Sequence, residues 1–147
     1  MPEPPVVNSS PLIVLSRAGM LDLLRLAGDR ILVPKAVALE INEYGSADIA
    51  AQALRATEWI EVVEAPSIPM AVRNSRLGAG ESAVLAWALS HPDTQAILDD
   101  QSARRRAAAL GVPTIGTLRL ILDAKDQGLI DEAAPAIERA RRAGLYL

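Results

Sequence analysis

Residues 95–100, QAILDD, decide the fold, because four residues of strand character run directly into two adjacent aspartates. A short apolar run bounded by polar residues is typical of a buried strand. Residues 5–8, PVVN, form a second run of this kind and lead into Ser9 and Ser10. Three further runs of strand character lie at residues 30–33, 59–63 and 112–114.

Segments with helical spacing separate these short strands. They cover residues 12–24 with an interruption near Gly19, and residues 35–44, 47–57, 81–90, 101–110, 115–127 and 131–143. Residues 65–80, rich in proline and glycine, are expected to form a loop or lid inside the domain. Short strands that alternate with helices predict an α/β fold. We therefore expect one domain over residues 1–147, a three-layer α/β/α sandwich with a short-stranded, mostly parallel sheet.

The composition excludes several kinds of functional site. Half of the 147 residues are hydrophobic and 22% are charged, which is typical of a globular protein. There is no cysteine, which excludes disulfides, thiolate metal sites and a cysteine nucleophile. The single histidine, His91, argues against a histidine-rich zinc site and a Ser-His-Asp triad. The four aromatic residues argue against a stacking platform for single-stranded nucleic acid.

The net charge of −3 excludes a polycationic coat for nucleic acid, but not an enzyme that acts on one. Lys35 and Lys125 are the two lysines among 15 basic residues. Arginine is the better planar partner for phosphate, although high-GC coding also enriches it. The sequence shows no signal-peptide pattern and no stretch long enough to span a membrane. We expect a soluble, cytoplasmic protein.

Polar residues follow the predicted strands at one edge of the sheet. Asn8 comes directly after the first strand, and Asp99 and Asp100 come directly after the fourth. Glu40 and Glu81 lie in or at the start of helices. In parallel sheets the site lies beyond the carboxyl ends of the strands, at a switch point. Converging carboxylates repel one another unless a hard cation such as Mg²⁺ or Mn²⁺ binds between them. We expect these acids to share one cation, with Asn8 at the rim.

Each of these residues also has a purely structural interpretation. Glu81 is favoured by the dipole at a helix N-terminus, and Asp99 or Asp100 could cap the following helix. Glu40 could point to solvent together with Glu43, one turn later. Asn8, Ser9 and Ser10 could form only a turn and a helix cap, and Thr114 and Thr117 could do the same for the following helix. The three arginines at residues 104–106 are most often a solvated face.

The order of these motifs resembles the PIN-domain family, in particular a VapC-like subgroup of nucleic-acid-binding proteins. The resemblance covers nearly the whole chain. It rests on residues 6–13, VVNSSPLI; on Val33-Pro34 leading to Glu40-Ile41; on residues 77–83, LGAGESA; on residues 97–100, ILDD, followed by Ala103-Arg104; and on residues 111–118, GVPTIGTL. Members of this subgroup continue further than Leu147, so the resemblance implies a shortened C-terminus.

The resemblance implies roles for the polar residues. Asn8 stands where the family usually has its first aspartate, and Glu40 and Glu81 stand at the second and third acidic positions. Asp99 or Asp100 matches the fourth, and the choice between them stays open. These carboxylates would hold Mg²⁺ or Mn²⁺, directly or through water, while Asn8 orients a ligand or the attacking water. The resemblance places further groups around them: Ser9 and Thr117 to hydrogen-bond a phosphate or a carboxylate, and Arg73, Arg76 or Arg104 to contact phosphate.

The first function that follows is a metal-dependent ribonuclease that hydrolyses RNA phosphodiesters. It would be the toxin of a toxin–antitoxin pair, with a small antitoxin protein as partner, and would form a homodimer. Asn8 brings no charge, which weakens metal binding and supports an alternative. The alternative is a catalytically weakened or inactive PIN domain that binds RNA or protein. A third hypothesis, a small α/β interaction domain without metal, requires the acids to be dispersed.

Overall fold

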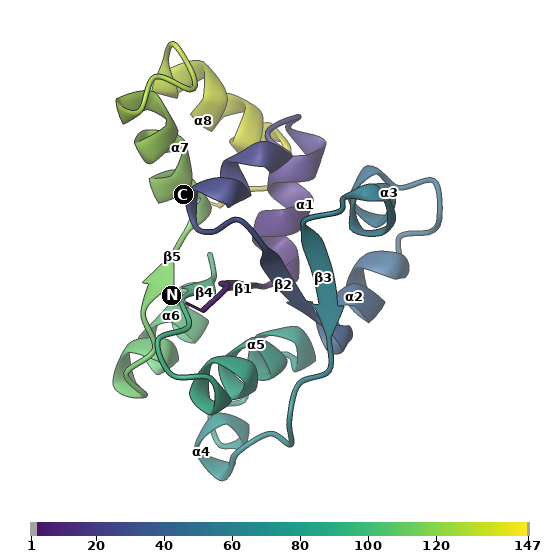
Figure 1. The fold of residues 1–147 in the computed structure, drawn as a ribbon, viewed down its shortest axis with the longest axis vertical. Coiled ribbons are helices and arrows are strands. Elements are labelled where there is room, and N and C mark those ends of the chain that lie inside the picture. The colour runs from purple at the N-terminus through teal and green to yellow at the C-terminus, as the bar shows by residue number, and fades with distance from the viewer. Residues whose placement is uncertain (1–2, 147) are drawn as a thin grey trace.

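The computed structural model describes residues 3–146, which form a five-stranded sheet with helices on both faces (Figure 1). All strand pairs are parallel, in the spatial order β3-β2-β1-β4-β5. This confirms the α/β prediction and makes the sheet wholly rather than mostly parallel. The strands are β1 (Val6–Val7), β2 (Ile31–Pro34), β3 (Ile60–Val63), β4 (Ala96–Ile97) and β5 (Thr114–Ile115).

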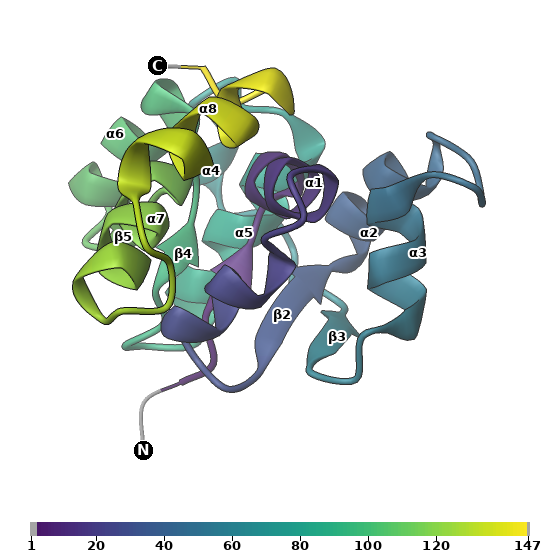
Figure 2. The same cartoon turned by 90° about the horizontal axis from the view of Figure 1, so that it is seen from above.

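Two sets of helices enclose the sheet, and Figure 1 shows them on either side of it. The first set packs together through α1 and comprises α1 (Ser9–Arg17), the 3₁₀ helix η1 (Leu21–Leu26), α3 (Ile49–Ala56), α7 (Thr117–Asp126) and α8 (Ala133–Arg142). The second lies across β2, β1 and β4 through α5 and comprises α4 (Met70–Arg73), α5 (Ala79–Ser90) and α6 (Gln101–Ala109). Helix α2 (Lys35–Asn42) packs against α1 and α3 and also against α5 of the second set. Figure 2 looks down on the set that contains α1, α7 and α8, with α5 behind. Both faces of the sheet are therefore covered, as all-parallel sheets require.

The local chemistry at the helix ends explains where the elements stop. The expected interruption near Gly19 is a left-handed residue, with φ of 73°, that ends α1. Behind it the Met20 amide donates to the Leu15 carbonyl over 2.8 Å, which closes the helix as a C-terminal cap. The strands themselves are completely buried at β1, β2 and β4, and their side chains join one apolar core.

The segment at residues 65–80 differs from the expected loop. It contains one helical turn, α4, and α5 begins at Ala79 rather than at Glu81. A single turn is too short to show a helical period in the sequence, which is why the pattern missed it. The earlier start of α5 places Gly80 inside the first turn of the helix, with consequences for the site described below.

The sheet order creates a switch point between β1 and β4. The chain leaves β1 toward β2 and β3, but leaves β4 toward β5 on the opposite side. Loops that depart in opposite directions open a crevice at the carboxyl ends of these two strands. Asn8 and Asp99 lie just beyond those ends, because the Asn8 amide still donates to Ile97 and the Leu98 amide to Ile115.

Within residues 3–146, no helix combines the length and the apolar character that crossing a membrane would need.

Candidate active site

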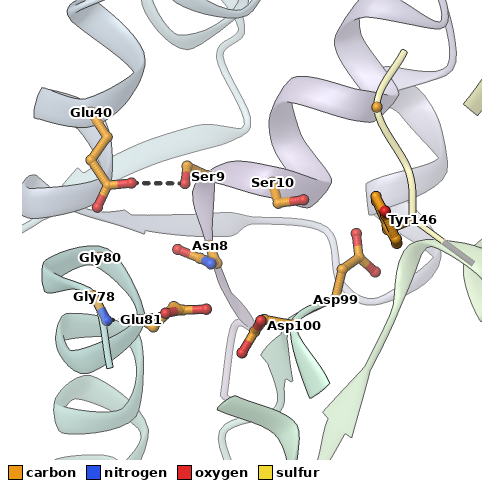
Figure 3. Close-up of a pocket in the computed structure, with 11 residues that line it drawn as sticks. Asn8, Ser9, Ser10, Glu40, Gly78, Gly80, Glu81, Asp99, Asp100 and Tyr146 are labelled. Atoms are coloured by element: carbon orange, nitrogen blue, oxygen red, sulfur yellow. Dashed lines mark hydrogen bonds between the residues drawn. The ribbon is translucent and has the colours of Figure 1, made fainter. Parts of the chain in front are cut away.

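A pocket of about 380 Å³ opens at this switch point (Figure 3). It brings together the ends of β1 and β4, the starts of α1 and α5, the middle of α2 and the segment after α8. The residues that line it are Asn8, Ser9, Ser10, Glu40, Gly78, Gly80, Glu81, Asp99, Asp100, Gly144 and Tyr146. All four acidic residues singled out in the sequence thus face one space, an arrangement that does not favour the hypothesis of dispersed acids.

Asn8 lies at the floor of the pocket and not at its rim, where the sequence analysis placed it. Asn8 is only 5% exposed, and its Oδ1 has no hydrogen-bond partner among the described residues. An orphaned buried acceptor is costly and calls for a ligand, water or ion. Gly80 makes this position possible, because a Cβ there would lie 3.1 Å from Asn8 Oδ1 and would collide with the Glu40 carboxylate.

Glu40 is held by the start of α1. The Ser9 hydroxyl donates to Glu40 Oε2 over 3.0 Å, shown by the dashed line in Figure 3. This bond crosses from α1 to α2, so it fixes one carboxylate oxygen and leaves Oε1 directed toward Gly80. Ser9 therefore orients an acid in this structure.

Glu81 lies in the first turn of α5, and its surroundings shift the pKa of its carboxyl. The Gly78 amide donates to its Oε1 over 3.1 Å, which satisfies a free N–H of the helix end. Burial, and then the negative charges of Asp100 and Glu40, raise the pKa of this carboxyl above its usual value, against the opposing effect of the Gly78 bond. The structural interpretation of Glu81 as a helix-start acid is correct, and the residue faces the pocket as well.

Asp99 is fixed by the start of α7. The Thr117 amide donates to Asp99 Oδ1 and the Thr117 hydroxyl to Oδ2, each over 2.7 Å. Thr117 is fully buried, whereas Asp99 is half-buried and lines the pocket. Gly116 provides the room, because a Cβ there would lie 3.1 Å from Asp99 Oδ1. Thr117, like Ser9, therefore hydrogen-bonds a carboxylate.

The hydrogen bond that Asp100 makes is mainly structural, because it caps a helix. Its Oδ2 accepts from the Ala103 amide over 2.9 Å and so caps α6. Its charge still raises the pKa of Glu81, so the two carboxyls are close enough to repel each other. The cap interpretation thus applies to Asp100, whereas Asp99 makes the bonds to Thr117.

The three arginines chosen from the sequence lie outside the lining of the pocket, within the described residues. Arg73 lines a separate groove together with Lys35. Arg104 lies beside the pocket, in a hollow that it shares with Asp99. The structure adds Tyr146 to the lining, which sequence reasoning missed because its position depends on the turn after α8.

The donor set consists of hard oxygens, as Mg²⁺ and Mn²⁺ prefer. The unpartnered Asn8 Oδ1 fits a cation that approaches from the pocket. Over residues 3–146, however, no three acidic or histidine side chains cluster tightly enough to bind an ion together. The arrangement therefore does not favour direct binding of one ion by three acids, and binding directly or through water stays a prediction. A magnesium-like ion that keeps several of its waters would suit this looser arrangement.

Comparison with known proteins adds a family to this geometry. A family model described as a PIN domain matches residues 4–147, nearly the whole chain. A search of curated proteins gave no match.

Proposed function

Because the chain belongs to the PIN-domain family, whose fold is of nuclease type, we propose that it is a divalent-metal-dependent endoribonuclease. One observation carries the proposal: four acidic residues and a buried amide oxygen that has no partner within residues 3–146 face one pocket at the switch point of a parallel sheet. A pocket of this charge repels the phosphates of RNA unless a cation offsets it.

The hydrogen bonds of the pocket residues assign each of them a role in holding the ion or its waters. Glu40 and Asp99 would hold Mg²⁺ or Mn²⁺ through oxygens that Ser9 and Thr117 orient, while Glu81 and Asp100 add charge and hold its waters. A bound divalent ion supplies an activated water and stabilises charge on a phosphodiester. Asn8 Oδ1 would accept from a metal-bound water and so orient it. Arg104, beside Asp99, would contact a phosphate of the strand.

Cleavage of a fluorescent, unstructured single-stranded RNA in the presence of Mn²⁺ tests the proposal. We expect slow endonucleolytic cleavage that EDTA abolishes and that Glu40→Gln and Asp99→Asn each reduce by at least about 100-fold. Glu43→Gln is the matched control, since Glu43 lies one turn after Glu40, is exposed and lies outside the pocket. Equal rates for Glu40→Gln and Glu43→Gln would contradict the proposal and point to a contaminating nuclease.

Asn8 favours a second candidate, a PIN domain that binds RNA or protein without cutting. An amide carries no charge, so the water of the bound cation would be a weaker nucleophile than beside an aspartate. The same assay separates the two functions. RNA that is bound by the wild type but stays intact in both Mn²⁺ and Mg²⁺ would support the second candidate.

We further propose that the protein is the toxin of a toxin–antitoxin pair, with a small protein as its antitoxin. The motifs that resemble the VapC-like subgroup support this role. Expression in a bacterial host should then arrest growth, and Glu40→Gln should remove the arrest while the protein still accumulates. Normal growth at a high level of folded wild-type protein would contradict this role.

A further inference from the structure

The pocket continues into a second groove, and the two share Gly144 and Tyr146 as lining. Arg141 and Arg142 line the far part of this groove. Arg142 also reaches a third hollow, which contains Arg17 and Arg139. The acidic pocket and this groove therefore meet at Gly144 and Tyr146, and arginines line both the groove and the hollow next to it.

The turn after α8 fixes the position of the tyrosine. The Leu145 amide donates to the Ala140 carbonyl over 2.9 Å, and the Gly144 amide to Arg141 over 3.0 Å. With Gly144 at φ 117°, these bonds form a helix-ending motif in which the next apolar side chain packs back on the helix. Leu145 is buried accordingly, and Tyr146 follows it toward the pocket, on the side of Asp99 (Figure 3).

Tyr146 differs from the other aromatic residues in the availability of its ring. Trp87 stacks on His91, while Arg17 lies over Tyr44 and Arg25 lies over Trp59. Tyr146 is 97% exposed and lines the pocket, so both faces of its ring are open to a ligand. The small number of aromatics argued against a stacking platform, but one ring at the pocket is enough to stack one base.

The arginines next to Tyr146 are also available. Arg141 and Arg142 both approach Glu138, at 3.5 Å, with side chains 60% and 78% exposed. Exposed ion pairs of this kind contribute little, so a phosphate can replace the carboxylate at small cost. Two arginines that share one acid leave a net positive charge on this side of the acidic pocket.

We propose that segment 141–146 is the track on which the RNA strand leaves the pocket: Tyr146 stacks on an unpaired base next to the phosphate in the pocket, and Arg142 binds the following phosphate. The inference rests on the proposed ribonuclease function and specifies its substrate as single-stranded RNA with an exposed base. A duplex keeps its bases stacked on one another and cannot offer one to the tyrosine.

The test measures binding separately from cleavage. Every protein carries Asp99→Asn, so that a labelled eight-nucleotide RNA stays intact, and affinity is read by fluorescence anisotropy in Mn²⁺. We expect Tyr146→Ala to weaken binding at least about five-fold, and Tyr146→Phe to bind like the parent protein. Tyr44→Ala, at an exposed tyrosine outside the pocket, should have no effect. An RNA of the same length without bases should bind Tyr146→Ala and the parent equally.

The arginine is tested through the salt dependence. Arg142→Ala should make the dependence of log K on log salt shallower by about 0.7, the value for one phosphate contact on a single strand. Arg119→Ala is the matched control, because Arg119 is also exposed and pairs with an acid at a spacing of four residues, Asp123. Equal slopes for the two variants would contradict the phosphate contact of Arg142.

The outcomes separate the track from the nuclease function. If wild type cleaves RNA but Tyr146→Ala binds as tightly as Tyr44→Ala, or more tightly, the track is wrong and the nuclease proposal stands. If RNA binding depends on Tyr146 but wild type never cleaves, the track is supported and the nuclease proposal fails. If none of the proteins binds the RNA, the track is wrong, and if wild type also fails to cleave the RNA, the nuclease proposal fails as well.

Discussion

Asn8 presents a buried amide oxygen, without a partner among the described residues, to a pocket lined by four acids. We predict that Asn8→Asp binds Mn²⁺ more tightly, on the order of ten-fold, because it adds a negative charge where the cation would be held. Without metal the same variant should unfold at a lower temperature, since its charge is buried near Glu40. Isothermal titration and thermal melts check both effects. Equal Mn²⁺ affinity in the two proteins would mean that Asn8 does not face the cation.

Ionised Glu81 destabilises the folded protein, because its carboxylate is partly buried and lies near the negative charges of Asp100 and Glu40. Because its pKa is raised in the folded protein, ionisation of Glu81 at neutral pH opposes folding. We predict that Glu81→Gln, without metal, melts above wild type at neutral pH, because it removes this charge. As the pH falls through the raised value toward the usual 4.5, wild type protonates and the difference disappears. Mn²⁺ should stabilise wild type more than the variant. A variant that is less stable at neutral pH would contradict this account.

At the scale of the elements, the first turn of α5 shows how one glycine serves the site. Alanine is the better helix former by about 1 kcal/mol, yet a Cβ at Gly80 would collide with Glu40 and crowd Asn8. We predict that Gly80→Ala leaves the free energy of unfolding within about 1 kcal/mol of wild type, as propensity offsets the crowding, but lowers cleavage at least about ten-fold. Denaturant unfolding and the cleavage assay test the two parts. Full activity would show that the pocket tolerates a shift of Glu40.

Asp48 stabilises the start of α3, away from the pocket. Burial opposes its ionisation, but hydrogen bonds from the Ala51 and Ala50 amides and the Arg17 guanidinium at 3.0 Å outweigh it and lower its pKa. We predict that Asp48→Ala costs about 1–2 kcal/mol at neutral pH. The lowered pKa makes this contribution complete above the usual 3.8, and it is lost as the pH falls through the folded value. Urea unfolding over a pH series measures it, with the exposed Asp29→Ala as control. A pH-independent loss would contradict the role of the charge.

The elements also show what the sequence can and cannot predict. Short apolar runs and helical periods give the alternating strands and helices, because burial imposes those patterns locally. The single turn α4 has no period to detect, and the start of α5 depends on the bond that the Gly78 amide donates to Glu81. The acids of the pocket were found because parallel strands end at one edge. The clamp of Asp99 by Thr117 joins residues 18 apart in the chain, and no local pattern encodes it.

At the scale of the whole molecule, assembly is the open prediction. The apolar helix faces around residues 21–26 and 49–54 are broad enough to suggest pairing of two copies, but Leu23, Leu24 and Leu54 are buried in the core. Four large apolar residues in this half of the sheet are exposed instead. They are Leu39 on α2, Tyr44 just after α2, Ile49 on α3 and Val62 on β3.

We still predict a two-fold homodimer, now through these exposed residues, since the edge strand β3 and its neighbouring helices offer apolar surface. Light scattering at micromolar concentration should give twice the monomer mass, and Ile49→Glu should give the monomer. Leu129→Glu, at an equally exposed leucine between α7 and α8, is the control and should stay dimeric. A monomer mass for wild type would contradict the prediction.

The crevice between β1 and β4 comes from the direction in which the chain leaves the sheet, and it does not depend on the side chains that line it. Evolution can therefore change the chemistry of the pocket while the backbone keeps its shape. On the proposed function, an amide in place of an acid, as at Asn8, would lower turnover and leave the crevice in place. The two candidate functions, cutting RNA and holding it, would then differ by point mutations in the pocket and not by a change of fold.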